Sequence, residues 1–333
     1  MPFSKITGLG HYVPENVVSN NQLSNLMDTT DEWITERTGI KERRFFTEGK
    51  DTVSNMAARA AKVALERAGK KTEDVDAIIF ATLSPDYYFP GAGVLMQREL
   101  GISKIPCFDV RSQCAGFLYA LSIADQYIKS GMYKTILVAG SEIQSNMLEM
   151  SDRGRTMSVI FGDGAGACVV EAHEEKGKGI LSTHLHSDGT HAEELLLKLP
   201  SSSMFQRGLV DGIKESGEIL PYMNGKLVFQ YAVKYFMEAI NEALEFNNYT
   251  QSDVDLLIPH QANARITEYV RKEMNMPPEK VISNIHKYGN TTAASIPIAF
   301  TEAWEEGKVK DGDLIALAAF GSGFVWGSVL IRW

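Results

Sequence analysis

The sequence predicts an α/β fold made of two similar halves, and three observations support this prediction. Short, continuously apolar runs alternate with amphipathic helical patterns along the chain, which is typical of parallel strands buried on both faces. One arrangement of helix, polar break, Asp-Val-Asp and apolar run occurs twice, in residues 53–83 and 228–262. No flexible linker separates the two copies, so we expect them to pack in layers as one rigid body.

The two copies share a register. Their Asp-Val-Asp motifs, which begin at Asp74 and Asp253, lie 179 positions apart. The same offset aligns Ala60 with Ala239, Ala64 with Ala243, Leu65 with Leu244 and Ile136 with Ile315. Amphipathic helices reuse alanine and leucine, so unrelated units can look alike, but the shared register favours duplication. We therefore predict an N-terminal half of residues 1–172 and a C-terminal half of residues 173–333.

The expected buried strands are short and have apolar residues at almost every position. They are AIIFATL (77–83), TILVAG (135–140), LLIP (256–259) and LIALAAF (314–320). Residues 173–225 fit this pattern less well, because they are rich in Gly, Ser, Lys and Glu. We expect strands and a surface excursion there.

Composition excludes several classes of protein. Apolar residues make up 44% and charged residues 23% of the 333 residues, which is typical of a globular chain rather than a disordered, collagen-like or disulfide-rich one. No apolar run approaches the ~18 residues of a membrane helix, and the N-terminus shows no secretory signal. A net charge of −9 argues against a general nucleic-acid binder. Three cysteines suit a reducing compartment, so we expect a cytoplasmic protein without membrane attachment.

Cys114 stands between a predicted strand, residues 107–110, and a predicted helix from Ala115 to Lys129. Chemistry gathers at such junctions in open α/β sheets. The helix dipole and unpaired amides favour a thiolate at a helix start, so we expect a lowered thiol pKa and a nucleophile at Cys114. Cysteines are otherwise small core residues, which is our interpretation of Cys107 and Cys168.

Two polar residues of the second half stand at similar junctions. His260 follows a predicted buried strand, and histidine is the common proton-transfer group near neutral pH, although a lone histidine is often structural. Asn290 precedes another helix and could simply cap it. However, Cys114 lies 17 residues before Gly131, and Asn290 lies 17 residues before Gly307. The repeat thus predicts that Asn290 occupies the place of Cys114 and that the two helix starts meet.

Three further patterns bear on ligand binding. Gly321 and Gly323, in AFGSGFVWG (319–327), allow the backbone to approach a ligand closely and offer N–H groups to an oxyanion. FGDGAGACVV (161–170) lacks the spacing of a dinucleotide loop and continues into a β-like run, which indicates a turn or strand packing. A group of histidines and one aspartate gives only a weak metal signal, so we predict no metal site. This group consists of His184, His186, Asp188 and His191.

Cys114, His260 and Asn290, in that order, resemble the Cys-His-Asn triad of the 3-oxoacyl-ACP synthase III family, which has the thiolase-like fold. Seven blocks spread over nearly the whole chain carry the resemblance. They are DTTDEWITERTGIKERR (28–44), QCAGF (113–117), DRG with FGDGAGA (152–167), STHLHSDG (182–189), PHQAN (259–263), YGNTTAAS (288–295) and AFGSGFVWGS (319–328).

The resemblance implies a homodimer whose subunits contain two βαβαβαββ halves in an αβαβα arrangement. It also implies a ping-pong reaction that needs no cofactor. Cys114 would take a short acyl group from acyl-CoA, and malonyl-ACP would then lose CO₂. His260 and Asn290 would stabilise the resulting enolate, which attacks acyl-Cys114 to give 3-oxoacyl-ACP. The backbone N–H groups of Cys114 and Ser322 would hold the tetrahedral oxyanion.

The resemblance further implies binding residues for both substrates. Trp33 would stack on the CoA adenine, with Arg37 and Arg153 nearby. The pantetheine channel would be lined by Thr29, Gly225, Phe229 and Asn263, and the acyl carrier protein would meet Gln261, Ala262, Asn263, Ala264 and Arg265. Carrier proteins are acidic, so Arg271 and Lys272 are further candidates, unless they only form a solvated helix face. Phe89 would reach the acyl pocket of the second subunit.

Two features depart from the family, and several alternatives remain. Ser322 stands where many members have glycine, and residues 191–222 match poorly, so the preferred acyl chain is left open. A related condensing enzyme of specialised metabolism, with a longer or unusual acyl donor, is the nearest alternative. A Cys-His-Asn protease is disfavoured because the papain-like cysteine signature is absent. Thiolase is rejected, because it needs a second, C-terminal cysteine as a base and no cysteine follows Cys168. A non-catalytic acyl-binding relative is usually marked by a lost triad, and this triad is intact.

Overall fold

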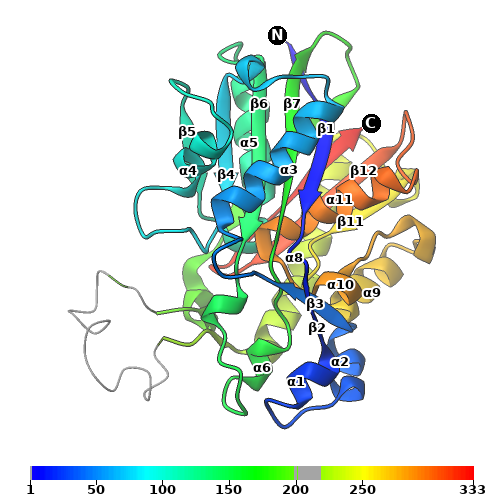
Figure 1. Cartoon of the computed structure of the whole chain (residues 1–333). Helices are drawn as coiled ribbons and strands as arrows, with labels where there is room; N and C mark the ends of the chain where they lie inside the picture. Colours follow the sequence, from blue (N-terminus) through cyan, green and yellow to red (C-terminus); the bar gives the residue numbers. More distant parts are fainter. Residues whose placement is uncertain (1, 199–200, 202–218) are drawn as a thin grey trace.

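The computed structural model describes residues 2–198, 201 and 219–333. Two main sheets organise the molecule (Figure 1). The first has the strand order β1-β7-β6-β4-β5 and the second the order β11-β12-β13-β8. The first contains β1 (Phe3–Tyr12), β4 (Ala77–Ala81), β5 (Cys107–Val110), β6 (Thr135–Glu142) and β7 (Gly164–His173). The second contains β8 (Gly179–Ser187), β11 (Leu256–Pro259), β12 (Leu314–Gly321) and β13 (Val325–Arg332).

The two sheets repeat one pairing scheme. In each, a parallel pair (β4 with β6, β11 with β12) continues into two antiparallel strands. The counterpart of β5 in the second sheet is a single parallel bridge between Leu257 and Val281. The α/β prediction with two similar halves is confirmed. The predicted boundary at 172/173 falls at the end of β7 and stays a prediction.

The register of the sheets follows the 179-residue offset of the sequence. Ala77 pairs with Ile136 in the first sheet, and Leu256 pairs with Ile315 in the second. The second aspartate of each Asp-Val-Asp motif has the same role, because it accepts a hydrogen bond from the N–H at the start of the neighbouring strand. The Asp76 bond to Thr135 N and the Asp255 bond to Leu314 N are both 2.9 Å long.

Helices and sheets alternate in five layers. Two central helices, α5 (Gly116–Lys129) and α11 (Ser295–Glu305), lie between the sheets and contact strands of both. The outer face of the first sheet carries α3 (Val53–Arg67) and α4 (Ala92–Glu99), and that of the second carries α8 (Gly225–Phe246) and α9 (Ala264–Glu273). Within the described ranges, no helix is long and apolar enough to cross a membrane.

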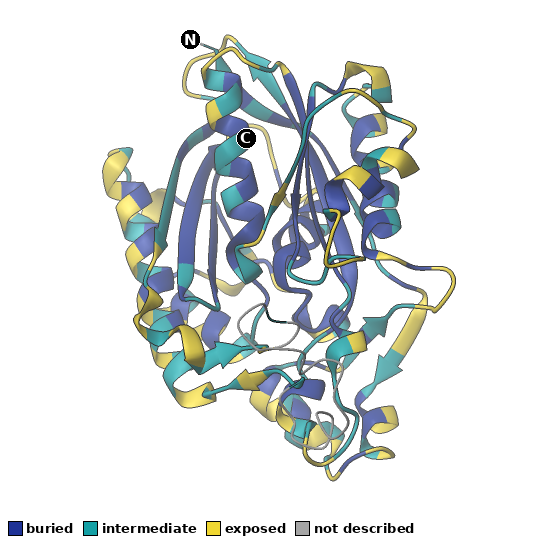
Figure 2. Ribbon diagram, turned by 90° about the vertical axis from the view of Figure 1, so that its left-hand side faces the viewer, coloured by how far each residue is buried: buried dark blue, intermediate teal, exposed yellow. Residues whose placement is uncertain are grey.

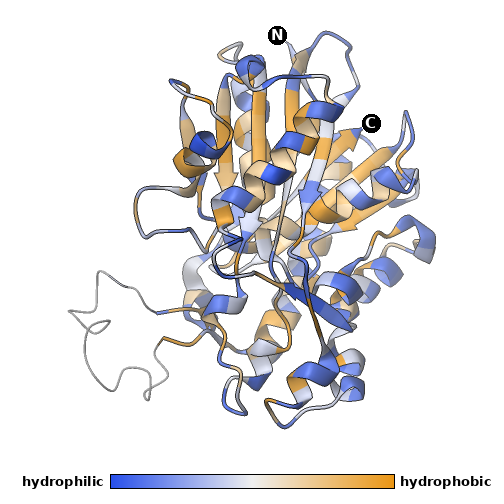
Figure 3. Ribbon diagram, viewed as in Figure 1, coloured by the Kyte–Doolittle hydropathy of each residue, from blue (hydrophilic) through white to orange (hydrophobic). Residues whose placement is uncertain are grey.

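The strands are buried on both faces, as their continuous apolar sequences predict. In β4, Ile79 belongs to the core between the sheets, whereas Ile78 and Phe80 belong to the core under α3 and α4. Successive side chains of a strand point to opposite faces, so an apolar run fills both cores. Figures 2 and 3 show the strands of both sheets as buried and apolar.

The remaining short elements lie around one end of the sheets (Figure 1). They are β2 (Asn16–Ser19), α1 (Asn20–Ser24), α2 (Asp31–Thr38), β3 (Glu42–Phe45), α6 (Arg155–Ser158), β9 (Leu195–Leu196), β10 (Tyr222–Met223) and α10 (Ile285–Tyr288). Of the poorly matching segment 191–222, residues 199–200 and 202–218 lie outside the described residues. Its described residues include β9, the start of β10 and the end of a 3₁₀ stretch that begins at Gly189 and is kinked at His191.

The predicted equivalence of Cys114 and Asn290 is wrong. Each central helix follows one 3₁₀ turn, η2 (Gln113–Ala115) or η8 (Thr292–Ala294), and these turns lie 179 positions apart. Gln113 and Thr292 even share a positive φ, 43° and 47°. Cys114 therefore corresponds to Ala293. The equal spacings to glycine arise because α11 has 11 residues and α5 has 14, so Asn290 lies one turn earlier.

Candidate active site

Cys114, His260 and Asn290 line one cavity of about 120 Å³. The N-terminal half contributes Cys114, and the C-terminal half contributes His260 and Asn290, so the structure brings the predicted triad together. The remaining wall is mainly apolar and includes Leu195, Phe229 and Phe320. Water-poor surroundings of this kind strengthen every polar interaction at the three side chains.

Cys114 lies in η2, between β5 and α5. Its neighbours are small because the two halves meet here. A Cβ atom at Gly321, the last residue of β12, would lie 2.9 Å from the Cys114 amide nitrogen. A Cβ atom at Gly116 would lie 3.5 Å from the Cβ of Ala293 in η8, an ordinary contact distance. Glycine at position 321 thus allows the end of β12 to approach the thiol, and the start of α5 lies beside η8.

The expected thiolate at Cys114 is not supported by the surroundings of the sulfur. Burial raises the pKa of the Cys114 thiol to about 12, and the nearby carboxylate of Glu142 adds to this rise, while the residue's own backbone N–H opposes it. Burial penalises the charged form and here outweighs the favourable helix start. The Cys114 thiol is therefore neutral at rest, and the predicted role as a nucleophile requires that it lose its proton during a reaction.

Glu142 is a site residue that the sequence reasoning missed. It ends β6 and is fully buried. The hydroxyls of Thr82 and Ser84 donate to its carboxylate at 3.1 and 2.5 Å. The Gln144 amide donates to Glu142 at 3.2 Å and to the Thr292 hydroxyl at 3.5 Å. The only sequence signal was an acidic residue at the carboxyl end of an apolar strand.

His260 follows β11 and is 2% exposed. Its Nδ1 lies 2.6 Å from the Ser295 hydroxyl, and its buried Nε2 has no hydrogen-bond partner among the described residues. Burial lowers the pKa of His260 to about 3, so the imidazole is neutral near pH 7. A hydroxyl can donate or accept, so Ser295 supports either tautomer and lets Nε2 accept or donate a proton.

Asn290 is held by its backbone and by its side-chain oxygen. Its amide donates to Ile160 O at 2.9 Å, and its carbonyl accepts from Gly162 N at 3.1 Å. The side-chain Oδ1 accepts from Thr292 N at 2.8 Å. Since this bond fixes the oxygen, the NH₂ group is the part of the carboxamide that can serve as a donor to a substrate.

The glycine-rich loop after β12 contributes both backbone and side-chain groups. Gly321 lines the cavity. The Ser322 hydroxyl donates to the backbone oxygen of Leu195, another cavity residue. The oxyanion role of the Cys114 and Ser322 N–H groups stays a prediction.

A cationic and aromatic group lies on and beside α2. The Arg37 guanidinium is 4.4 Å from the Trp33 ring centroid, and the Arg155 guanidinium is 5.3 Å from it. The predicted Arg153 instead contacts Glu149 at 2.8 Å. Sequence reasoning missed Arg155, although it lies two residues after the predicted arginine in the same block.

Asn263 connects the Trp33 group to the cavity. It lines the cavity together with Gly225 and Phe229, and its Nδ2 donates to Arg37 O at 3.0 Å. Thr29, predicted for the same channel, does not line the described cavity; its hydroxyl is buried without a hydrogen-bond partner among the described residues. Asn263 thus contacts both the cavity that contains Cys114 and the helix that carries Trp33.

The predicted carrier-protein residues differ in exposure. Arg265 is exposed, whereas Gln261 is 1% exposed and its side chain bonds Pro259 O, Ile282 O and Asn284 N. We therefore leave Gln261 out of any surface for a protein partner. Ala262 lines the cavity, and Ala264 packs beside α2.

Two further basic residues of α9 are already paired. The Arg271 guanidinium donates twice to the Glu268 carboxylate at 2.7 Å, and Lys272 lies 3.4 Å from the same carboxylate. This arrangement favours the alternative interpretation of a solvated helix face for these two residues.

Phe89 does not line the cavity of its own chain. It is 80% exposed, and the neighbouring Tyr87 and Tyr88 are 60% and 67% exposed. Its role in the acyl pocket of a second subunit stays a prediction.

The histidine group and the FGDGAGA segment have structural partners. His186 lies 2.5 Å from Glu242, and His191 lies 2.7 Å from the Tyr231 hydroxyl. Within the described part of the chain, no group of three or more His, Cys, Asp or Glu side chains could hold a metal ion. Phe161 forms a parallel bridge with Asn290 and Gly164 begins β7, so the FGDGAGA segment takes part in strand packing, one of the two predicted interpretations.

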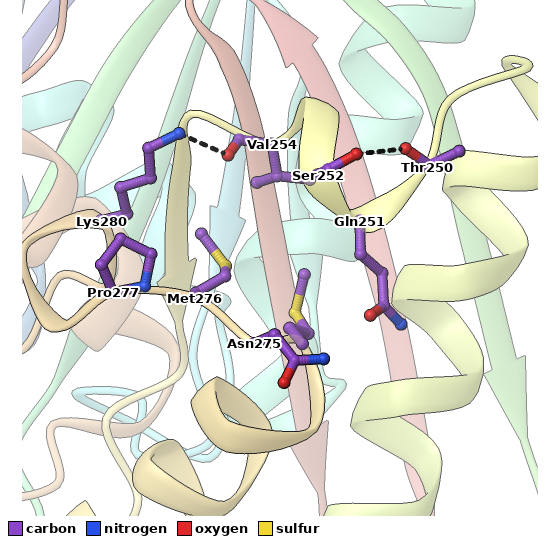
Figure 4. Close-up of a pocket in the computed structure, with 9 residues that line it drawn as sticks. Thr250, Gln251, Ser252, Val254, Asn275, Met276, Pro277 and Lys280 are labelled. Carbon is purple, nitrogen blue, oxygen red and sulfur yellow. Dashed lines mark hydrogen bonds between the residues drawn. The ribbon is translucent and has the colours of Figure 1, made fainter.

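A larger pocket of about 640 Å³ lies away from the triad, between residues 250–254 and 274–280 (Figure 4). Its polar groups bond locally. Lys280 Nζ donates to Val254 O at 3.2 Å, and the hydroxyls of Thr250 and Ser252 are 2.8 Å apart. None of the three triad residues lines it, so its size alone does not make it the reactive site.

The chemistry available in the small cavity is acyl transfer. A thiol supplies a nucleophile, a neutral imidazole can move a proton, and a carboxamide supplies a second neutral donor. Donors of this kind stabilise negative charge that develops on a carbonyl oxygen.

Known proteins match this chain over its whole length. The family described as 3-oxoacyl-[acyl-carrier-protein (ACP)] synthase III matches residues 108–189, and the C-terminal region of that enzyme matches residues 244–333. The β-ketoacyl-[acyl-carrier-protein] synthase III of Thioalkalivibrio sulfidiphilus is 44% identical over 334 residues, which cover 100% of both chains.

Solved structures give the same result. The 3-oxoacyl-[acyl-carrier-protein] synthase III from Aquifex aeolicus is 44% identical, with a TM-score of 0.90 over 99% of this chain and 100% of that chain. A priming β-ketosynthase from a polyketide biosynthetic pathway is 33% identical, with a TM-score of 0.90 over 99% of this chain and 96% of that chain.

Proposed function

The chain belongs to the 3-oxoacyl-[acyl-carrier-protein] synthase III family, and we propose that it condenses a short acyl-CoA with malonyl-ACP to start fatty acid synthesis. The products are 3-oxoacyl-ACP, CoA and CO₂. The observation that carries the proposal is the convergence of Cys114, His260 and Asn290 on one cavity. A cavity of about 120 Å³ suits a short acyl group such as acetyl.

The first half-reaction is acyl transfer to sulfur. Nε2 of His260 accepts the proton of the Cys114 thiol while the sulfur attacks the thioester carbonyl of acyl-CoA. The backbone N–H groups of Cys114 and Ser322 hold the oxyanion. When the intermediate collapses, the C–S bond to CoA breaks and the CoA sulfur takes the proton from His260. The neutral resting pair requires this proton transfer, since neither partner is ionised beforehand.

The second half-reaction makes the carbon–carbon bond. The malonyl thioester loses CO₂, and the negative charge of the resulting enolate is stabilised by His260 Nε2–H and the Asn290 NH₂ group. The enolate carbon attacks the acyl-Cys114 carbonyl, the C–S bond to Cys114 breaks, and the departing thiolate takes a proton from water. This proton balances the loss of CO₂ from the malonyl carboxylate. His260 must therefore be a proton acceptor in one step and a donor in the other, and the Ser295 hydroxyl at 2.6 Å serves both tautomers.

The substrates enter past α2. Trp33 stacks on the adenine. Arg37 and Arg155 supply positive charge near the CoA, because both guanidinium groups lie over the Trp33 ring. Arg153 is retained as a neighbouring contact for CoA. The pantetheine arm passes Thr29, whose hydroxyl lacks a hydrogen-bond partner among the described residues.

Carrier protein, dimer and location complete the proposal. Acidic carrier protein docks beside Asn263 and Ala264, where Arg265 offers an exposed cation. The exposed aromatic residues 87–89 support a homodimer in which Phe89 enters the second subunit's acyl pocket. All three cysteines are free, which supports a cytoplasmic location.

The proposal is tested by measuring the two half-reactions separately. Purified enzyme is incubated with acetyl-CoA and then with malonyl-ACP, and acyl-enzyme and 3-oxoacyl-ACP are quantified by mass spectrometry. Asn290→Ala should retain acylation but slow condensation by ~10²–10³-fold, the usual cost of one lost oxyanion donor. Equal loss of both half-reactions would contradict the enolate role of Asn290.

A condensing enzyme of specialised metabolism is the second candidate, favoured by the likeness to the polyketide priming ketosynthase. It would show a strict preference for a longer or unusual acyl-CoA. A panel of acyl-CoAs with malonyl-ACP as the fixed acceptor separates the two, because the primary function requires efficient use of a short donor.

A further inference from the structure

The Ser322 side chain connects the loop after β12 to the wall of the reactive cavity. Its hydroxyl donates to the backbone oxygen of Leu195 in β9. Leu195 lines the cavity that contains Cys114. A glycine at position 322, as the family resemblance leads one to expect, could not make this bond.

The bonded residue belongs to a small two-stranded unit. Leu195 pairs with Met223 of β10, and both side chains line the cavity. Asn224 N donates to Glu194 O at 2.8 Å, and Asn224 Nδ2 bonds Glu194 Oε2 at 3.0 Å. Because β9 and β10 are joined in this way, holding Leu195 also holds the Met223 part of the wall.

The loop after β12 also holds the chain at Asp188, before that chain reaches β9. Asp188 and Phe324 exchange two backbone hydrogen bonds, of 2.8 and 2.6 Å. The Ser322 hydroxyl adds a contact seven residues further along, at the point where the chain reaches the cavity. It therefore acts at the wall itself rather than at the base of the segment.

We propose that Ser322 is a specificity-determining residue whose hydroxyl holds Leu195 inward and so limits the length of the acyl group on Cys114. This inference rests on the proposed function. The cavity of about 120 Å³ is well below the ~300 Å³ at which pockets for drug-sized ligands begin. A longer acyl group must push Leu195 outward, and this movement breaks the hydrogen bond from Ser322. The lost bond penalises longer acyl chains.

The test compares acyl donors within each variant. Ser322→Ala and Ser322→Gly are acylated with acetyl-, butanoyl- and hexanoyl-CoA, and kcat/KM for acyl-enzyme formation is measured by mass spectrometry. The ratio of hexanoyl to acetyl should rise about three- to tenfold, the value of one net hydrogen bond. A disturbed oxyanion site would slow all donors together and leave this ratio unchanged.

Two further variants sharpen the result. Ser328→Ala removes another serine bond to a backbone oxygen, Ser328 Oγ to Ala239 O at 2.6 Å, outside the cavity lining, and should leave the ratio as in the unsubstituted enzyme. Leu195→Ala enlarges the cavity directly and should raise the ratio of hexanoyl to acetyl. If Ser322 acts through Leu195, adding Ser322→Ala to Leu195→Ala should raise it little further.

The outcomes separate this inference from the proposed function. An unchanged ratio in both Ser322 variants, with normal acylation of the unsubstituted enzyme, would overturn the inference alone. A full additional rise in the double variant would also overturn it, since Ser322 would then act elsewhere. Absence of acylation by every donor in the unsubstituted enzyme would overturn the proposed function itself.

Discussion

At the scale of residues, the reactive pair is neutral at rest. Burial raises the pKa of Cys114 to about 12 and lowers that of His260 to about 3. A buried ion pair would have to offset the desolvation of both charges. A neutral thiol and imidazole avoid that cost. In the proposed reaction the proton moves only when a thioester is present, and the new charge develops on the substrate carbonyl.

Glu142 should control how easily the thiol ionises. Its charge adds to the rise of the Cys114 pKa, so Glu142→Gln should lower this pKa. The measurement is the rate of Cys114 alkylation by iodoacetamide from pH 6 to 10, which lies below the pKa of the thiol, and the rate at each pH should be higher in Glu142→Gln. Glu171→Gln is the matched control, because Glu171 pairs with Lys70 at 2.6 Å. An unshifted profile in Glu142→Gln would contradict the electrostatic role.

Residues that act through distant contacts could not be predicted from the sequence. The triad lies at strand-to-helix junctions, which sequence patterns reveal. Ser295 and Glu142 owe their roles to partners 35 and up to 60 positions away, and no local pattern encodes such contacts. The thiol pKa was mispredicted for the same reason, since the helix start is a local feature and burial is a tertiary one.

At the scale of elements, the site is the meeting place of two 3₁₀ turns and the end of β12. The offset of 179 predicted the pairing of the strands, because the loop before β12 is longer than the loop before β6 and makes up for the shorter α11. The equivalence of Cys114 and Asn290 failed because α11 is three residues shorter than α5. The spacings were counted back from Gly131 and Gly307, which follow the C-terminal ends of the two helices. Such a count cannot detect a difference in helix length.

Gly140 tests the fit between β6 and η8. A Cβ atom there would lie 2.5 Å from Ala293 O, so Gly140→Ala must displace η8 and with it the Thr292 amide that orients Asn290. We expect a loss of about 1–3 kcal/mol in unfolding free energy, measured by urea denaturation, and slower condensation than acylation. Gly189→Ala is the control, since a Cβ atom there meets nothing within 4 Å. Equal behaviour of the two variants would contradict the account.

At the scale of the whole molecule, the two halves are packed into one body by the core between the sheets. That core contains residues of both halves, among them Ile79, Phe117, Ile258 and Leu317. The apolar runs predicted this layered arrangement. The approach of β9 and β10 to the cavity could not be predicted, because their residues follow no regular pattern.

The buried histidine should make the stability of the whole protein sensitive to acid. The folded state holds His260 with a pKa of about 3 against an ordinary value of 6.5. Its contribution is therefore fully present above pH 6.5 and is lost as the pH falls towards 3, because the unfolded chain binds the proton more readily. The loss is at most about 1.4 kcal/mol per pH unit.

The comparison with His260→Asn isolates this effect, since asparagine does not titrate. The difference in unfolding free energy between the unsubstituted protein and this variant is measured by urea denaturation from pH 8 to 4.5. As the pH falls below 6.5, the unfolding free energy of the unsubstituted protein should decrease relative to that of His260→Asn. A difference that stays constant over this range would show that His260 is not held neutral by burial.

The central claim is that the sulfur of Cys114 carries the acyl group. Its most direct test is intact-mass analysis after incubation with acetyl-CoA, followed by peptide mapping of the modified residue. The account predicts one added acetyl group per chain, located on Cys114, lost in Cys114→Ser and retained in the control Cys107→Ser. An acetyl group on any other residue, or unchanged acylation of Cys114→Ser, would contradict it.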